Sequence, residues 1–107
     1  MFRISIKESY AMNSKVGYVS EKSEYKPNGI WVYGACSCVA NVKVGDILIE
    51  DYEKEKAYKV LDFPMVRRAE YKADHIDIFI RPIEENEDVV NWFEYSKIMV
   101  GKVLITV

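Results

Sequence analysis

NVKVGDILIED, residues 41–51, predicts two short strands joined by a tight turn. Valines occupy every second position before the Gly45-Asp46 pair, and isoleucines occupy every second position after it, which is the period of a half-buried strand. Gly45 provides a permissive backbone at the turn, and Asp46 can cap the turn by accepting a hydrogen bond from a nearby backbone N–H. We therefore interpret the Lys-Val-Gly-Asp step as architecture that requires no ligand.

The same period of two recurs along most of the chain and predicts further short strands. The segments are FRISIK (2–7), KVGYVS (15–20), IWVYGACSCVANV (30–42), AYKVLDF (57–63), HIDIFIRPI (75–83) and KVLITV (102–107). Turn signals separate them, above all Asn28-Gly29 and the charged DYEKEK at 51–56. Gly34 lies inside the long apolar run and predicts a bulge or a bend, as where a strand turns a barrel corner. PMVRRAEYKAD (64–74) has no sustained period and is expected to be a loop.

Alternation along a strand also assigns side chains to its two faces. The expected faces are Phe2, Ile4 and Ile6 against Arg3, Ser5 and Lys7; then Ile76, Ile78 and Ile80 against His75, Asp77, Phe79 and Arg81; and Val103, Ile105 and Val107 together on one face of the last strand. Pro82 is expected to end or edge its strand because it cannot donate to a ladder.

Together these segments predict an all-β fold, a small antiparallel β-barrel or sandwich of six to seven strands. We favour the barrel, closed or partly open, with one short helical turn near 86–97. An aromatic content of 13% agrees with this class, because aromatic side chains favour pleated, half-buried surfaces. The length of 107 residues fits a single domain covering 1–107.

The charge balance and hydropathy exclude several classes of protein. A net charge of −2 is not the basic surplus that binding to a nucleic-acid backbone normally shows. No run of eighteen apolar residues exists, so no membrane-spanning helix is expected. The N-terminal MFRISIKESY mixes polar with apolar residues, unlike the continuous apolar core of a signal peptide. The expected location is therefore the cytoplasm.

The two cysteines, Cys36 and Cys38, are expected on one face of a strand, where neighbours rarely meet disulfide geometry. A structural zinc site would want four ligands, and the single histidine, His75, lies far along the chain. We interpret the cysteines as buried thiols, with a redox or metal role as the alternative, and predict no metal site and no cofactor.

His75 is the side chain most able to titrate near neutrality. It shares the expected outer strand face with Asp77, and such a pair could orient an imidazole, but Ser96 or Cys36 would have to approach as nucleophile. We favour a solvated strand face for His75. The paired carboxylates Glu50-Asp51, Glu84-Glu85 and Glu87-Asp88 are likewise expected to face water in turns.

Three stretches resemble the β-barrel domain that follows the GTPase domain in translation factors such as elongation factor Tu. They are ISIKESYAMNSKVGYVS (4–20), VKVGDILI (42–49) and KADHIDIFIRPIE…GKVLITV, in which Asp74 takes the turn carboxylate, Ile76 to Ile80 the strand, and Gly101-Lys102-Val103-Leu104 the closing step. Ala73 stands where the family usually has glycine, residues 21–34 are extra length with no clear counterpart, and residues 84–97 are longer than the family's usual connection. The resemblance implies a part that does not catalyse, one that braces the GTPase domain and contacts the aminoacyl-tRNA end or the ribosome.

Two groups of residues are candidate partner contacts. Arg67 and Arg68, beside Tyr71 and Lys72 on the 64–74 loop, offer charge-assisted donors to a phosphate or carboxylate, although an ordinary charged loop has the same composition. Trp92, with Phe93 and Tyr95, suits an aromatic anchor at an interface, but we favour a plug at one end of the barrel for Trp92 and Phe93.

These observations favour a non-enzymatic binding module that recognises a protein partner. The resemblance alone adds RNA or the ribosome as a partner, and no membrane partner is expected. The alternative from another class is a small immunity-type protein that neutralises a basic toxin by direct binding, with acidic turns that steer the encounter. A small enzyme using His75, Asp77 and the cysteines is a third hypothesis. A homodimer through pairing of strand edges is left open.

Overall fold

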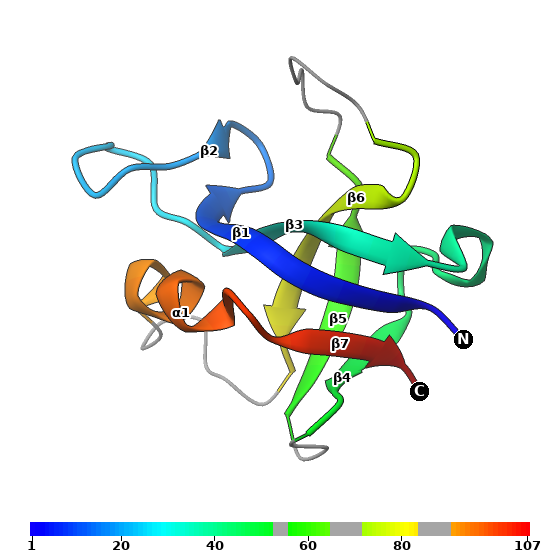
Figure 1. The fold of residues 1–107 in the computed structure, drawn as a ribbon. Helices are drawn as coiled ribbons and strands as arrows, with labels where there is room; N and C mark the ends of the chain where they lie inside the picture. The colour runs from blue at the N-terminus through cyan, green and yellow to red at the C-terminus, as the bar shows by residue number, and fades with distance from the viewer. Residues whose placement is uncertain (53–55, 65–71, 84–90) are drawn as a thin grey trace.

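Six antiparallel strands form a closed barrel in the computed structural model, which describes residues 1–52, 56–64, 72–83 and 91–107 (Figure 1). Around the barrel the strands are β1 (Arg3–Asn13), β3 (Gly29–Ser37), β6 (His75–Pro82), β5 (Ala57–Asp62), β4 (Ile47–Glu50) and β7 (Val103–Thr106). The barrel closes because β7 pairs back with β1, from Arg3 opposite Ile105 to Ser5 opposite Val103. This confirms the predicted all-β class and the barrel within it.

Three further elements of the described chain lie outside this ring of strands. The two-residue strand β2 (Gly17–Tyr18) pairs with the end of β1, where Met12 lies opposite Tyr18. The helix α1 (Trp92–Met99) packs against β1 and β3, and a short 3₁₀ turn, η1 (Val39–Asn41), follows β3. The predicted helical turn is therefore present at 92–99, whereas 84–90 lies outside the described residues.

The barrel interior is filled by side chains from alternate positions of every long strand. Phe2, Ile4 and Ile6 are buried and the residues between them are exposed, as the period of two predicted. The largest fully buried side chains are Tyr58, Phe2, Phe79, Ile4, Ile30, Leu48, Ile78, Ile80, Met99, Leu104, Val19 and Val32. Burial of aliphatic and aromatic area of this kind is the main stabilising contribution to a small domain.

The 43–46 turn has the architectural role expected of it. Gly45 adopts a φ of 96°, which favours glycine, and Asp46 Oδ2 accepts a hydrogen bond from the Lys43 backbone N–H at 2.9 Å. The prediction of a strand immediately before the turn was wrong, because the 3₁₀ turn η1 occupies 39–41. Of the two strands predicted on either side of the turn, the second is present as β4.

Gly34 marks a close approach between β3 and β1. It pairs with Ile6 at the point where the β1 register shifts between Ile6 and Glu8, so a bulge re-aims β1 there. A Cβ atom added to Gly34 would collide with the carbonyl group of Ser5. A bulge was predicted at Gly34 and one is present there, but it lies in the paired strand β1, and the backbone contact leaves no room for a side chain at Gly34.

One expectation about strand faces needs correction. Phe79 was expected on the wet face of its strand with His75, Asp77 and Arg81, yet it is fully buried, with its ring against the backbone of Gly29. In β7 nothing contradicts the expectation that Val103 and Ile105 share a face, and Leu104, on the opposite face, enters the core. Pro82 ends β6, as expected.

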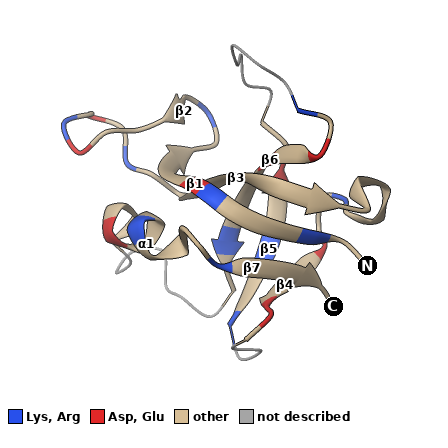
Figure 2. Ribbon diagram, in the orientation of Figure 1, with Lys and Arg blue, Asp and Glu red and all other residues tan. Residues whose placement is uncertain are grey.

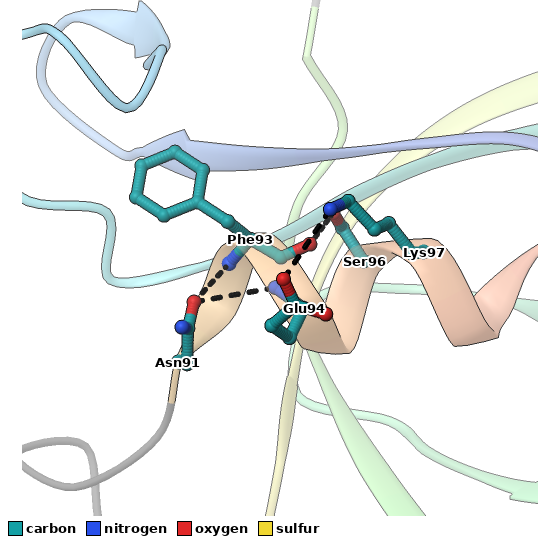
Figure 3. A network of polar contacts seen from close by, with 5 residues as sticks. All are labelled: Asn91, Phe93, Glu94, Ser96 and Lys97. Carbon is teal, nitrogen blue, oxygen red and sulfur yellow. Dashed lines mark hydrogen bonds and ion pairs between the residues drawn. The ribbon is translucent and has the colours of Figure 1, made fainter.

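The start of α1 is fixed by local polar contacts (Figure 3). Asn91 Oδ1 accepts from the backbone N–H groups of Phe93 and Glu94 at 3.1 and 3.2 Å, which satisfies two of the donors that a helix N-terminus leaves open. Ser96 donates to the Phe93 carbonyl at 2.8 Å, and Lys97 contacts Glu94 one turn away. Such an N-cap contributes about 1 kcal/mol to stability.

The cysteines do not share a strand face, because β3 ends at Ser37 and Cys38 adopts a left-handed conformation with a φ of 58°. Both thiols are free, Cys36 half-buried and Cys38 exposed, so the expectation of two buried thiols was wrong for Cys38. Burial, and after it the charge of Asp74, raises the pKa of the Cys36 thiol, which keeps it in the less reactive protonated form.

Candidate functional site

The strand register gathers aromatic side chains on the outer face of β1, β3 and β6. Tyr10 lies opposite Trp31, and the next outward position of β3, Tyr33, lies opposite Asp77. The inward neighbours Ile30 and Val32 are fully buried, so these rings point out of the barrel. We call the set Tyr10, Tyr18, Trp31, Tyr33 and His75 the aromatic patch.

Part of this patch forms an open pocket of about 350 Å³. The described residues that line it are Glu8, Tyr10, Tyr18 and Trp31, contributed by β1, β2 and β3. The rings of Tyr10 and Tyr18 meet edge to face with centroids 5.7 Å apart, and those of Tyr10 and Trp31 lie 5.3 Å apart at a tilt of 50°. Three rings at different inclinations thus surround one concave site.

Hydrogen bonds hold two of these rings in place. The Tyr10 hydroxyl donates to Glu8 Oε1 at 2.5 Å, and the Trp31 indole N–H donates to Asp77 Oδ1 at 2.8 Å. Tyr10 and Trp31 are therefore each tied to a carboxylate at a nearby position of the sheet. A site built on strands and braced in this way is oriented before any ligand arrives.

His75 lies at the other end of the patch, and its side chain is only 6% exposed, so the expected solvated position was wrong. Its ring lies beside that of Tyr33, with centroids 5.4 Å apart and an interplanar angle of 31°. Lys7, at the register shift of β1, contacts the imidazole edge, with Lys7 Nζ 2.8 Å from Nε2. The contact with Lys7 of β1 accounts for the burial of the His75 side chain. The alternation of residues within one strand does not predict a contact of this kind.

The carboxylate that contacts His75 is Asp74, with Oδ1 2.8 Å from Nδ1, whereas Asp77 bonds to Trp31. This contact, first among several causes, lowers the pKa of Asp74. In the neutral imidazole, Nδ1–H donates to Asp74 and Nε2 accepts from Lys7, which satisfies both ring nitrogens. His75 thus contacts a carboxylate, an ammonium and an aromatic ring, and these contacts hold its side chain in place.

A second polar cluster lies at the junction of β4, β5 and α1. Glu50 was expected to face water in a turn, but it ends β4 with 5% exposure, which corrects that expectation. Its carboxylate accepts from the Tyr58 hydroxyl at 2.8 Å and from Lys102 Nζ at 2.6 Å. The Tyr58 oxygen also lies 3.2 Å from the Tyr95 hydroxyl, so the cluster ties the helix to the barrel wall.

Because of this cluster, the free energy of unfolding is expected to depend on pH in the alkaline range. Burial, and after it the hydrogen bonds to Tyr95 and Glu50, raises the pKa of Tyr58 far above its usual value of 10.0. A group whose pKa is higher in the folded than in the unfolded state contributes its full stabilisation at pH values below the unfolded-state pKa. This contribution decreases as the pH rises above the unfolded-state pKa. We expect the free energy of unfolding of the wild type to fall above about pH 10 more steeply than that of Tyr58→Phe. Urea denaturation of both proteins between pH 8 and 11 measures the difference, and parallel curves would contradict the expectation.

Of the contact residues predicted from the sequence, the structure describes Lys72 and Trp92, and neither lines the pocket. Arg67, Arg68 and Tyr71 lie outside the described residues, so their role as partner contacts stays a prediction, and Lys72 is exposed. Trp92 is 4% exposed and belongs to the barrel core, in agreement with the plug that we favoured for it.

Sequence reasoning did not single out Glu8, Tyr10, Tyr18 or Trp31. The signal available was the alternation itself, which places Tyr10 and Trp31 on the faces opposite their aliphatic neighbours. What the alternation does not give is the pairing of β1 with β3, on which the pocket depends.

In the part of the chain that the structure describes, no group of three or more His, Cys, Asp or Glu side chains is placed to hold a metal ion. The described helix is too short to cross a membrane. No protein-family model, curated protein or solved structure matches the chain. The barrel is established by its strand pairing, and the resemblance to a translation-factor domain stays a prediction.

Proposed function

We propose that this protein is a non-enzymatic binding module that recognises a protein partner through the aromatic patch. The observation that carries the proposal is the open pocket between Tyr10, Tyr18 and Trp31 on the outer face of the barrel. Tyrosine and tryptophan dominate the energetics of protein interfaces because they offer large, rigid contact area with a polar group at one end.

The position of Tyr18 adds to this argument. Its side chain is 60% exposed although it belongs to a strand that pairs with β1, so a large amphipathic ring faces solvent beside two others. Aromatic rings grouped at a concave site, with polar groups at the rim, are typical of a surface that a partner covers.

A translation-factor-like role is the finer form of the proposal. It rests on the resemblance of 42–49 and 101–104 to that family, segments that here form the β4 turn and the start of β7. Figure 2 shows Lys and Arg interspersed with Asp and Glu over the described elements, a distribution that favours a protein over a nucleic-acid backbone as the partner.

An immunity-type role, with a basic toxin as the partner, is the second candidate. The observation that favours it is the pair of carboxylates among the aromatic rings, Glu8 beside Tyr10 and Asp77 beside Trp31. Carboxylates at an interface speed the association with a basic partner and select against acidic ones.

The test is affinity capture from lysate of the native cells with three tagged proteins: the wild type, the double variant Tyr18→Ala/Trp31→Ala, and Tyr52→Ala as control. Tyr52 is 90% exposed on the turn after β4 and does not line the pocket. We expect one protein to be captured by the wild type and the control and to be lost, by about tenfold or more in amount, with the double variant, as removal of interface hot spots implies.

Circular dichroism establishes that the double variant is folded before its result is interpreted. Equal capture by all three proteins would contradict the proposed surface. A fourth protein, Arg67→Glu/Arg68→Glu, tests the loop predicted from the sequence. The identity of the captured protein, ribosome-associated or a toxin, then separates the two candidate roles.

A further inference from the structure

We infer that the pocket lined by Glu8, Tyr10, Tyr18 and Trp31 takes the guanidinium group of an arginine side chain on the protein partner. This inference deepens the proposed function and rests on it, because it names the group that the aromatic patch recognises.

The rings supply the first part of the recognition. Aromatic faces carry negative electrostatic potential and attract a cation placed within about 6 Å of the ring centroid. The rings of Tyr10, Tyr18 and Trp31 are 5.3 to 5.7 Å from their neighbours and tilted against each other, so one cation in the pocket lies near more than one ring. Tryptophan is the strongest of the aromatic side chains in this interaction.

Glu8 supplies the second part. It is the only charged residue among the described residues that line the pocket, so the formal charge of that lining is negative. Its Oε1 accepts from the Tyr10 hydroxyl at 2.5 Å. An ionised carboxylate has about four acceptor positions, so it can take N–H donors from a ligand in addition to the partners that it has within the chain.

The combination of a carboxylate with an aromatic wall selects arginine over lysine. A guanidinium is planar, stacks on aromatic faces, presents its donors in a fork that matches a carboxylate, and is more weakly hydrated than an ammonium. A lysine ammonium can meet the charge of Glu8 but cannot stack on Trp31. The open shape of the pocket admits a flat group that enters from solvent.

The walls of the pocket are held before the ligand arrives. Asp77 accepts from the Trp31 indole N–H at 2.8 Å, and the pairing of β1 with β3 sets Tyr10 directly opposite Trp31. Tyr18, on the two-residue β2, completes the third side. Little ordering is therefore needed on binding, which favours affinity for a single side chain.

The test is an NMR titration of the ¹⁵N-labelled full chain with the capped peptide acetyl-Gly-Arg-Gly-amide. Citrulline and lysine peptides of the same form are the comparison ligands, since citrulline keeps the planar shape without the charge. The chain has two tryptophans, so the indole resonance of Trp31 reports on the pocket and that of Trp92, 4% exposed in the core, is the internal control.

We expect saturable shifts of the Trp31 indole resonance with arginine and none of the Trp92 resonance. Lysine should bind more weakly by about fivefold and citrulline by about tenfold or more, the factor that separates a charge-assisted contact from a neutral one. Glu8→Gln, which keeps an acceptor for Tyr10, should weaken the arginine peptide by about tenfold, whereas Tyr52→Ala should leave it unchanged.

Two results would overturn the inference: no shift of Trp31 with arginine, or equal binding of arginine and citrulline. If either occurs while the affinity capture still depends on Tyr18 and Trp31, the proposed function stands and only the chosen occupant is wrong. If the capture is also independent of these residues, both fail. Adding Glu8→Gln to the capture distinguishes a cationic contact from a purely apolar one.

Discussion

Replacing Glu50 by alanine is expected to lower the free energy of unfolding by about 3 kcal/mol, the lower end of the range for breaking a buried ion pair. The carboxylate is buried and receives hydrogen bonds from Tyr58 and Lys102, so its removal leaves both donors without this acceptor in the protein. Lys102 is 29% exposed and can turn toward water, which is why the lower end applies. Urea denaturation at pH 7 measures the loss from the change in midpoint at constant slope.

The neighbouring acidic residue provides the control for this prediction. Asp51 forms an ion pair of 3.0 Å with Arg3 at the surface, where such pairs contribute less than about 1 kcal/mol. Asp51→Ala should therefore cost little, and Glu50→Gln, which keeps one acceptor, should lie between the two. A loss for Glu50→Ala no larger than that for Asp51→Ala would show that the buried cluster does not stabilise the fold.

Replacing Gly34 by alanine is expected to lower the free energy of unfolding by more than about 4 kcal/mol or to prevent folding. Losses of this size are exceptional and occur where the structure cannot rearrange to relieve the new contact. The added Cβ would collide with the Ser5 carbonyl, and backbone lies on both sides of the contact. Relief requires β1 to move away from β3, and β1 also closes the barrel through β7. The measurements are the yield of soluble protein, the circular dichroism spectrum and the urea midpoint.

Gly45→Ala is the matched control, because it separates a collision from backbone strain. Nothing lies within 4 Å of a Cβ added at Gly45, but its φ of 96° is unfavourable for alanine. A cost of about 1–2 kcal/mol is therefore expected there, with the fold retained. If Gly34→Ala were no more destabilising than Gly45→Ala, the close approach of β3 to β1 would not be a constraint on the barrel.

Most of the barrel was predictable because each long strand carries its own pattern. Phe2, Ile4 and Ile6 alternate with polar residues whatever the strand pairs with, and the Gly45-Asp46 step marks a turn by local backbone chemistry. The errors concern residues whose environment comes from another strand. Phe79 and His75 lie on the outer face of β6, where Gly29 packs on one ring and Lys7 covers the other.

For the candidate site, the sequence predicted aromatic residues but not the positions that form the pocket. The aromatic contact that the sequence offered was Trp92, as the alternative to a core plug, and the structure buries Trp92 in the core. The pocket instead takes Tyr10, Tyr18 and Trp31 from three strands, and positions 10, 18 and 31 become neighbours only through the pairing of β1 with β2 and β3. A pattern within one strand carries no record of which strand lies beside it.

The sequence by itself determined the all-β class, the turn at Gly45-Asp46 and a short helical turn near 86–97, because these depend on interactions within a few residues. Only the tertiary structure decided that Glu50 is buried against Tyr58 and Lys102, and that the outer face of β1, β3 and β6 carries an aromatic pocket. The reason is that burial and binding depend on contacts between residues far apart in the chain, and barrel closure sets those contacts through strand order and register.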